Sequence, residues 1–157
     1  MNQFKECRNI GLPSTVSTDF LLKINHGINA LSSQIRLLQE ELYPVAKKYS
    51  TRSAIILKML KAKEYVTVHY KEQILLDQLA QYVGISKFQL SKHFKCCFQC
   101  SPQQMQSRLR MNTAKTLLET TRDPISQIAL DLGYCDIAAF SKAFKGHYGV
   151  APKFFKN

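Results

Sequence analysis

Two stretches of the chain repeat nearly the same order of apolar, glycine and basic positions. The first is LAQYVGISKFQLSKHFKCCFQCSP (residues 79–102), and the second is IALDLGYCDIAAFSKAFKGHYGVAP (residues 128–152). Aligned, they pair Gly84 with Gly133 and, after a one-residue slip, Phe94 with Phe144. A duplicated structural module keeps matches of this kind.

The first copy predicts a helix, a tight turn and a second helix. An apolar helical face over residues 75–83 ends at Gly84, which can adopt the left-handed conformation without steric cost. Ser86 is well placed to cap the second helix. The apolar residues of that helix recur every four positions: Leu90, Phe94 and Phe98.

The second copy predicts the same arrangement, with different residues at the helix ends. Asp123 is expected to cap its first helix, with Pro124 at the first helical position. Gly133 should end that helix, and Asp136 should cap the next one. The expected buried stripe of the second helix is Phe140, Phe144 and Tyr148.

Two further helices are predicted around this repeat. Ser101 can cap a continuous helix that reaches about Thr120, with Pro102 at its first position. Residues 54–69 predict a helix that covers the first copy, and the segment YVTVHY (residues 65–70) at its end is the only competitor for a strand. The expected fold is therefore all-α, with two helix-turn-helix subdomains joined by a long helix and a helical extension before them.

The N-terminal extension carries a heptad pattern between Leu21 and Leu42. Leu21, Ile28, Ile35 and Leu42 occupy position a, and Ile24, Leu31 and Leu38 occupy position d. This pattern is typical of a parallel two-stranded coiled coil, so a homodimer through Leu21–Leu42 is one hypothesis. Gly27 inside the helix and mostly uncharged flanking positions count against it. Packing on the same chain, or on a separate sensor partner, is the alternative.

The net charge of the chain indicates what kind of partner it binds. Lys and Arg number 22 against 11 Asp and Glu, which gives a formal net charge of +11 at pH 7. Such an excess in a small protein indicates a polyanionic partner, such as nucleic acid or an anionic membrane. The chain has no apolar run long enough to span a bilayer, and its N-terminus lacks the apolar core of a signal peptide. We therefore expect a cytoplasmic protein.

From about residue 58 to residue 156 the chain resembles the DNA-binding domain of the AraC/XylS family of bacterial transcription regulators. The motifs that carry the resemblance are the LA…GIS and IA…GY turns, Arg110 with AKTLL behind it, and F-x3-F-K-x2-Y-G-x-x-P from Phe140. Gln99 departs from the pattern, because the family usually has glycine there, so this helix end should be less comfortably capped. Phe155 and Lys156 replace the usual Tyr-Arg pair.

The resemblance implies seven helices, two recognition helices in successive major grooves of double-stranded DNA, and control of transcription with RNA polymerase as a partner. Separately from the resemblance, we expect no enzyme activity and no cofactor, because only the stretch from His93 to Cys100 approaches a nucleophile–base pair or a metal cluster. The expected divisions are a flexible extension (1–16), a helical segment (17–50) and the DNA-binding domain (58–156). Its helix-turn-helix units are expected at about 77–98 and 125–148.

Helical geometry then selects the side chains expected to meet DNA. On the first recognition helix these are Lys87, Phe88, Ser91, Lys92 and Lys95. Lys92 could donate to a guanine edge, Ser91 to several bases, and Phe88 could meet a thymine methyl group. Lys87 and Lys95 suit phosphate contacts, which position the helix without reading sequence.

The second recognition helix presents a less polar set. The residues expected to face DNA are Ile137, Ala138, Ser141, Lys142 and Lys145. The side chains of Ile137 and Ala138 can form no hydrogen bonds, so weaker base discrimination is expected here. The alternative for the lysines of both helices is a merely solvated helix face.

A cluster of cysteines raises the question of a metal site. His93, Cys97 and Cys100 lie at i, i+4 and i+7, and Cys135 could add a fourth ligand for a soft metal. However, paired Cys-x2-Cys loops are missing, and free cysteines bury readily as small apolar groups. No metal site is therefore assigned. Metal or redox sensing involving Cys96 and its neighbours, and cysteine-based DNA repair, remain the minor alternatives.

Overall fold

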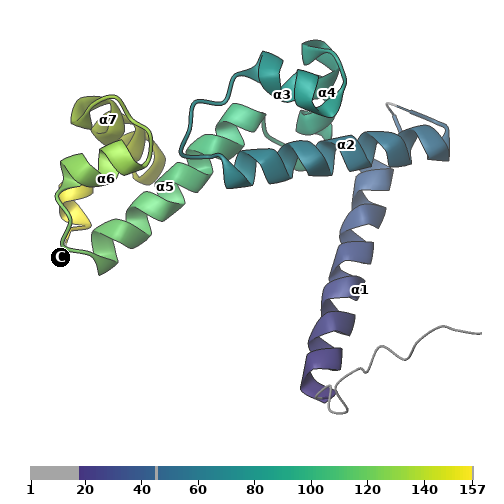
Figure 1. Ribbon diagram of the computed structural model, residues 1–157, viewed down its shortest axis with the longest axis horizontal. Coiled ribbons are helices and arrows are strands. Elements are labelled where there is room, and N and C mark those ends of the chain that lie inside the picture. Colours follow the sequence, from purple (N-terminus) through teal and green to yellow (C-terminus); the bar gives the residue numbers. More distant parts are fainter. Residues whose placement is uncertain (1–17, 45, 157) are drawn as a thin grey trace, which may run out of the picture. The chain divides into compact units, whose positions relative to one another are not determined.

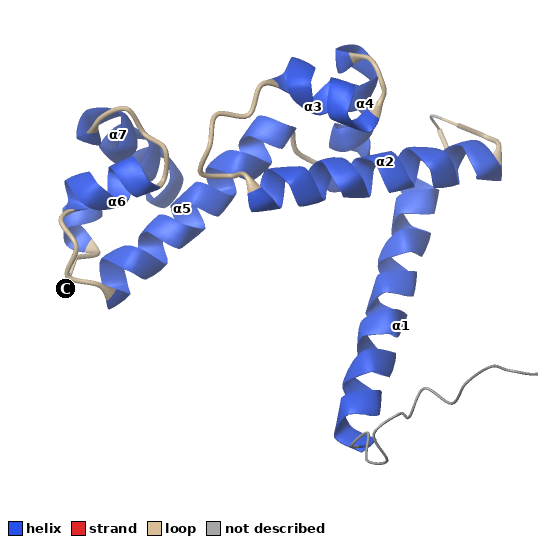
Figure 2. Cartoon of the chain, viewed as in Figure 1, coloured by secondary structure: helices blue, strands red, loops and turns tan. Residues whose placement is uncertain are grey.

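The computed structural model describes residues 18–44 and 46–156, and its regular structure over these residues is entirely helical (Figures 1 and 2). The helices are α1 (Thr18–Glu41), α2 (Tyr49–Val68), α3 (Leu76–Val83), α4 (Lys87–Phe98), α5 (Pro102–Thr120), α6 (Ile125–Asp131), α7 (Ile137–Tyr148) and the 3-10 turn η1 (Pro152–Phe154). The all-α prediction is confirmed. The YVTVHY segment contributes its first four residues to the last turn of α2.

The first helix-turn-helix consists of α3 and α4, which pack on α2. Gly84 ends α3 in the left-handed conformation, with φ of 66°. Ser86 and Gln89 form a reciprocal capping box at the start of α4, which satisfies two backbone N–H groups that the helix leaves unpaired. The fully buried Leu79, Leu90 and Phe94 lie in the core of this unit.

The second helix-turn-helix consists of α6 and α7. Its core contains Ile128, Leu132, Phe140 and Phe144, each at most 1% exposed. The carboxylate of Asp136 accepts a hydrogen bond of 2.6 Å from the backbone N–H of Ala139, which confirms the predicted cap of α7.

The predicted start of α6 is wrong by one residue. The helix begins at Ile125 and Pro124 is its N-cap, whereas Asp123 was expected to hold that position. Pro124 has an extended ψ of 144°, and its carbonyl accepts the hydrogen bond from the Ile128 N–H. No side chain caps this end. Asp123 instead offers its backbone carbonyl to the ammonium group of Lys156.

Helix α5 runs from the α3–α4 pair to the α6–α7 pair (Figure 1) and takes part in both cores. Met105 and Leu109 pack against the first core, and Met111, Ala114 and Leu118 belong to the second. A capping box of Ser101 and Gln104 starts the helix, with Pro102 in its first turn as predicted. Because one uninterrupted helix serves both cores, the two helix-turn-helix units have a fixed separation.

The predicted N-terminal helix is observed as α1, which ends at Glu41, three residues before Pro44. The chain divides into two compact parts, with the boundary after Leu37. The last two residues of the predicted seam, Leu38 and Leu42, are buried in the core of the first helix-turn-helix. Ile28 and Leu31, earlier on the same seam, are 55% and 51% exposed. The seam therefore packs within the chain at its C-terminal end.

The expected flexible extension, residues 1–16, lies outside the described residues. In the part of the chain that the structure describes, every helix is too short or too polar to cross a membrane.

Candidate nucleic-acid interface

The outer face of α4 carries the side chains that the sequence assigned to DNA. Lys87, Phe88, Lys92 and Lys95 are exposed and Ser91 is half-buried. Phe88 stands out because 76% of its surface is exposed, although it is a large apolar side chain. The burial of Leu90 and Phe94 on the opposite side fixes the rotation of α4 about its axis. The helix thus presents cations, a hydroxyl and an aromatic ring on one accessible face.

An ion pair that the sequence did not predict lies at the start of α4. The Lys87 ammonium nitrogen lies 2.7 Å from a carboxylate oxygen of Asp77 on α3. Both side chains are mostly exposed, so the pair contributes little to stability. Lys92 and Lys95 have no ion pair among the described residues, so they carry the uncompensated charge of this face.

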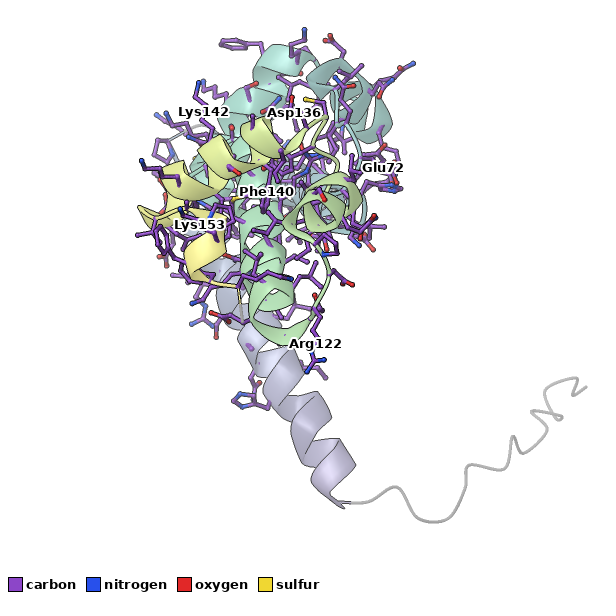
Figure 3. All side chains as sticks on the ribbon, turned by 90° about the vertical axis from the view of Figure 1, so that its left-hand side faces the viewer. Glu72, Arg122, Asp136, Phe140, Lys142 and Lys153 are labelled. Atoms are coloured by element: carbon purple, nitrogen blue, oxygen red, sulfur yellow. The ribbon has the colours of Figure 1, made fainter. Side chains whose placement is uncertain are left out.

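Helix α7 presents the corresponding face of the second unit. Ile137, Ala138, Lys142 and Lys145 are exposed and Ser141 is half-buried. In Figure 3, Phe140 is directed toward the interior and Lys142 away from it. Asp136 lies just before this face. Hydrogen bonds, first from the backbone N–H of Ala139 and then from the Cys135 thiol, lower the pKa of this carboxyl group below its ordinary value.

Arg110 ties the two helix-turn-helix units together. From α5, its guanidinium group donates to the carbonyl oxygens of Tyr70 (2.6 Å), Lys71 (3.2 Å), Glu72 (2.8 Å) and Gly133 (3.2 Å). The first three precede α3, and Gly133 lies in the turn between α6 and α7. The Gln106 side chain adds hydrogen bonds to the carbonyls of Tyr70 and Glu72. This cluster is named the Arg110 junction below.

Gly133 is required at the Arg110 junction for space as well as for conformation. It has φ of 76°, and a Cβ atom there would lie 1.9 Å from the carbonyl oxygen of Lys71. The backbone before α3 therefore lies directly against the turn of the second unit. The sequence had identified Arg110 only through the family pattern, and Gly133 only as a helix end.

Among the described residues, His93 and the cysteines are not grouped as the candidate metal site required. Cys97 and Cys100 are buried, the Cys96 thiol donates to the Glu41 carbonyl at 2.9 Å, and Cys135 is exposed in the second unit. Burial, followed by the Cys96 and Glu41 charges, raises the pKa of Cys97 to about 12. The described residues include no group of three His, Cys, Asp or Glu side chains placed to hold a metal ion.

Comparison with known proteins places these features among DNA-binding domains. The family model described as Helix-turn-helix domain matches residues 79–157, about half of the chain. The raffinose operon transcriptional regulatory protein RafR of Pediococcus pentosaceus is 33% identical over 95 residues, which are 60% of this chain and 34% of RafR. The chain therefore spans about a third of the length of that relative.

Two solved structures share the fold. A transcriptional regulator from Chromobacterium violaceum, described as containing an AraC-type DNA-binding domain, is 30% identical with a TM-score of 0.58; the match covers 63% of this chain and 88% of that one. The DNA-binding domain of AdpA, solved in complex with a target DNA, is 22% identical with a TM-score of 0.58; the match covers 62% of this chain and 87% of that one. At 22% identity, the second likeness concerns the fold alone.

Proposed function

Since the chain belongs to the AraC-type helix-turn-helix family, we propose that it is a sequence-specific regulator of transcription that inserts α4 and α7 into successive major grooves of double-stranded DNA. The observation that carries this proposal is the pair of capped helices, each with an exposed basic face opposite a buried apolar stripe. AdpA, which has the same fold, was solved on its target DNA. The family consists of DNA-binding regulators, and we propose no catalytic activity for this chain.

Within α4, we propose that the lysines make different kinds of contact with DNA. Lys92, near the middle of the exposed face, reads base edges together with Ser91 and Phe88. Lys95 and Lys87 contact phosphates, and Lys87 exchanges Asp77 for a phosphate oxygen when it does so. On α7, Ser141, Lys142 and Lys145 supply polar contacts, while Ile137 and Ala138 contribute only apolar ones.

The test starts with selection of bound sites from a random duplex pool. The binding constant for the selected site should fall linearly with salt on a log–log plot, with a slope of about −0.9 per phosphate contact. Lys92→Ala should relax the selected sequence, whereas the matched Lys95→Ala should lower affinity for all duplexes. Binding that is weak and insensitive to salt would refute the proposal. An unchanged site profile in Lys92→Ala would refute only the residue assignment.

For α1 we propose dimerisation through its exposed seam. Ile28 and Leu31 lie one helical turn apart and are both more than half exposed. A dimer contact would remove these two apolar side chains from water. Sedimentation equilibrium should show a dimer that Leu31→Glu dissociates. A monomer that binds DNA normally would favour the alternative, a separate sensor protein docking on the same face.

We also propose RNA polymerase as a partner that the DNA-bound regulator contacts. Transcription from a promoter carrying the selected site, with purified polymerase, would show activation or repression. A cytoplasmic location follows from the proposed DNA target.

A further inference from the structure

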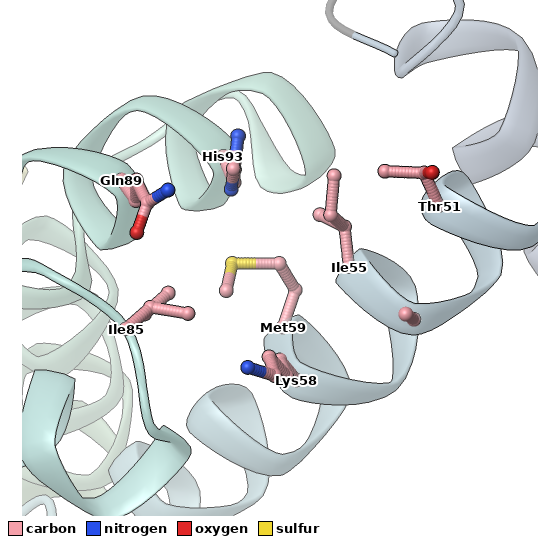
Figure 4. Close-up of a pocket in the computed structure, with 8 residues that line it drawn as sticks. Thr51, Ile55, Lys58, Met59, Ile85, Gln89 and His93 are labelled. Atoms are coloured by element: carbon pink, nitrogen blue, oxygen red, sulfur yellow. The ribbon is translucent and has the colours of Figure 1, made fainter. Parts of the chain in front are cut away.

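A pocket lies behind the first recognition helix, between α2 and α4 (Figure 4). Its volume is about 240 Å³. The residues that line it are Thr51, Ala54, Ile55, Lys58, Met59, Ile85, Gln89 and His93. The DNA-facing side chains of α4 play no part in it, so the pocket is a separate feature of the same helix.

The pocket combines an apolar floor with a single cation. Ile55, Met59 and Ile85 supply the floor, and Met59 is fully buried. The Lys58 ammonium group donates 2.9 Å to the carbonyl of Gly84 and has no ion pair among the described residues. None of the eight residues lining the pocket is acidic. An ammonium group beside an apolar surface attracts an anion more strongly than one surrounded by water.

His93 and Gln89 add hydrogen-bonding capacity on the α4 side. Burial, and then the neighbouring Lys92 charge, lower the pKa of His93 below its ordinary value, so its imidazole is neutral at pH 7. A neutral imidazole can donate one hydrogen bond and accept another. The Gln89 side chain oxygen is already used by the cap at Ser86. Among the eight residues that line the pocket, Lys58 is thus the one charged group available to a ligand.

We propose that this pocket binds a small carboxylate with a compact apolar body. The carboxylate pairs with Lys58, and the apolar body covers Ile55, Met59 and Ile85. The volume lies below the roughly 300–1,000 Å³ of pockets for drug-sized ligands, which restricts the ligand to a small acid. An alkylamine of the same shape would place its charge against Lys58 and should be excluded.

Such a ligand would act on DNA binding because it contacts the recognition helix itself. Gln89 and His93 belong to α4, and Ile85 belongs to the turn before it. A ligand that binds the DNA-bound and free states differently changes DNA affinity, and DNA then changes ligand affinity by the same factor. This second step rests on the proposed DNA-binding function, whereas the pocket itself does not.

The first experiment uses hexanoate as the probe, with hexan-1-ol and hexylammonium as matched compounds. Titration of the whole protein carrying ¹³C-labelled methionine methyl groups should shift the Met59 signal with hexanoate. Hexan-1-ol should bind at least tenfold more weakly, and hexylammonium should leave the signal unchanged. Equal binding of the acid and the alcohol would overturn the role of Lys58. An unperturbed Met59 signal with hexanoate would overturn the site.

Two variants and a control locate the interaction. Lys58→Met should bring hexanoate affinity down to that of hexan-1-ol, while Lys61→Met, a lysine on the same helix outside the pocket, should leave it unchanged. Ala54→Leu fills the pocket from an exposed helical position and should abolish binding of both. It keeps the test decisive if Lys58→Met unfolds after losing its bond to Gly84. Binding that survives Ala54→Leu would contradict the proposed location.

The second experiment measures DNA affinity with and without saturating hexanoate. The dissociation constant should change at least threefold, and Ala54→Leu should remove the change. An unaltered constant, with the Met59 shift still present, would overturn the coupling alone. A protein that shifts Met59 but binds no duplex would contradict the proposed function and leave the pocket standing.

Discussion

Gln99 holds a backbone conformation that L-residues rarely adopt. With φ of 54° at the end of α4, it is the only non-glycine residue with positive φ in the described chain. The left-handed region costs an L-residue about 1–2 kcal/mol, and glycine avoids that cost. The Gln99 side chain partly compensates by donating to Cys96 O at 3.0 Å and to a carboxylate oxygen of Glu41 at 3.3 Å. The departure from the family pattern is therefore visible as local strain.

Gln99→Gly should raise the free energy of unfolding by about 1 kcal/mol, because it removes this strain. Gln99→Ala keeps the strain and loses both hydrogen bonds, so it should lower stability. Urea denaturation of the two variants beside the parent protein measures both effects. A destabilised Gln99→Gly would mean that the side-chain bonds outweigh the backbone strain.

The thiols of this protein should differ sharply in reactivity. With a pKa of about 12, Cys97 is almost entirely protonated at pH 8, and it is buried as well. Only a thiolate is an effective nucleophile. Exposed Cys135 should therefore react with iodoacetamide in the native protein long before Cys97, and unfolding in urea should equalise them. Peptide mass mapping follows both sites; comparable native rates would contradict the buried, protonated state of Cys97.

Helix α5 is the element common to both helix-turn-helix units. Its capped start at Ser101 and its residues in both cores hold the units at one separation. Arg110 adds a second constraint by binding carbonyls before α3 and in the turn before α7. Helix α5 and the Arg110 junction thus set the orientation of α7 relative to α4. The helix-turn-helix pattern alone does not specify this orientation.

Gly133→Ala should lower the free energy of unfolding by more than about 2 kcal/mol, since it adds left-handed strain to a backbone clash. Gly146→Ala is the matched control, because that glycine lies within α7 with nothing within 4 Å of its added Cβ. It should raise stability by about 0.5–1 kcal/mol through helix propensity. Thermal unfolding compares the two; a harmless Gly133→Ala would show that the Arg110 junction is not tightly packed.

For the whole molecule, one fixed separation between the two helix-turn-helix units predicts a fixed spacing between two half-sites in the DNA. Adjacent major grooves on one face of B-DNA recur every ~34 Å, or about 10–10.5 base pairs. The two recognition helices also differ in chemistry. The face of α4 offers Ser91 and Lys92, whereas the first turn of α7 offers Ile137 and Ala138. The first unit should therefore supply most of the specificity.

A footprint should accordingly cover two successive major grooves on one face of the duplex. Base substitutions in the half-site of α4 should cost about 1–3 kcal/mol each, and those in the half-site of α7 less. Inserting five base pairs between the half-sites, which rotates one to the opposite face, should abolish binding by the second unit. Protection confined to one groove would contradict the geometry. Larger penalties in the half-site of α7 would reverse the ranking of the helices.

The amino-acid sequence by itself determined the helices, most of their ends and the duplicated unit. The signals for these features are local: an apolar period of 3.6 residues, a capping side chain such as Ser86 or Asp136, and a glycine able to adopt positive φ. They act over a few residues, so they can be recognised before any tertiary contact is known. The face of α4 followed from the same periodicity.

Tertiary structure alone decided which residues meet across the chain. The Arg110 junction joins α5 to backbone some 40 residues earlier, and the Lys87–Asp77 pair links two helices. The burial of Leu38 beside the exposure of Leu31 depends on where α1 reaches the core, although both occupy position d of one heptad pattern. The pocket beside Lys58 arises from the packing of α2 on α4. Each is a contact between distant segments, which no local pattern encodes.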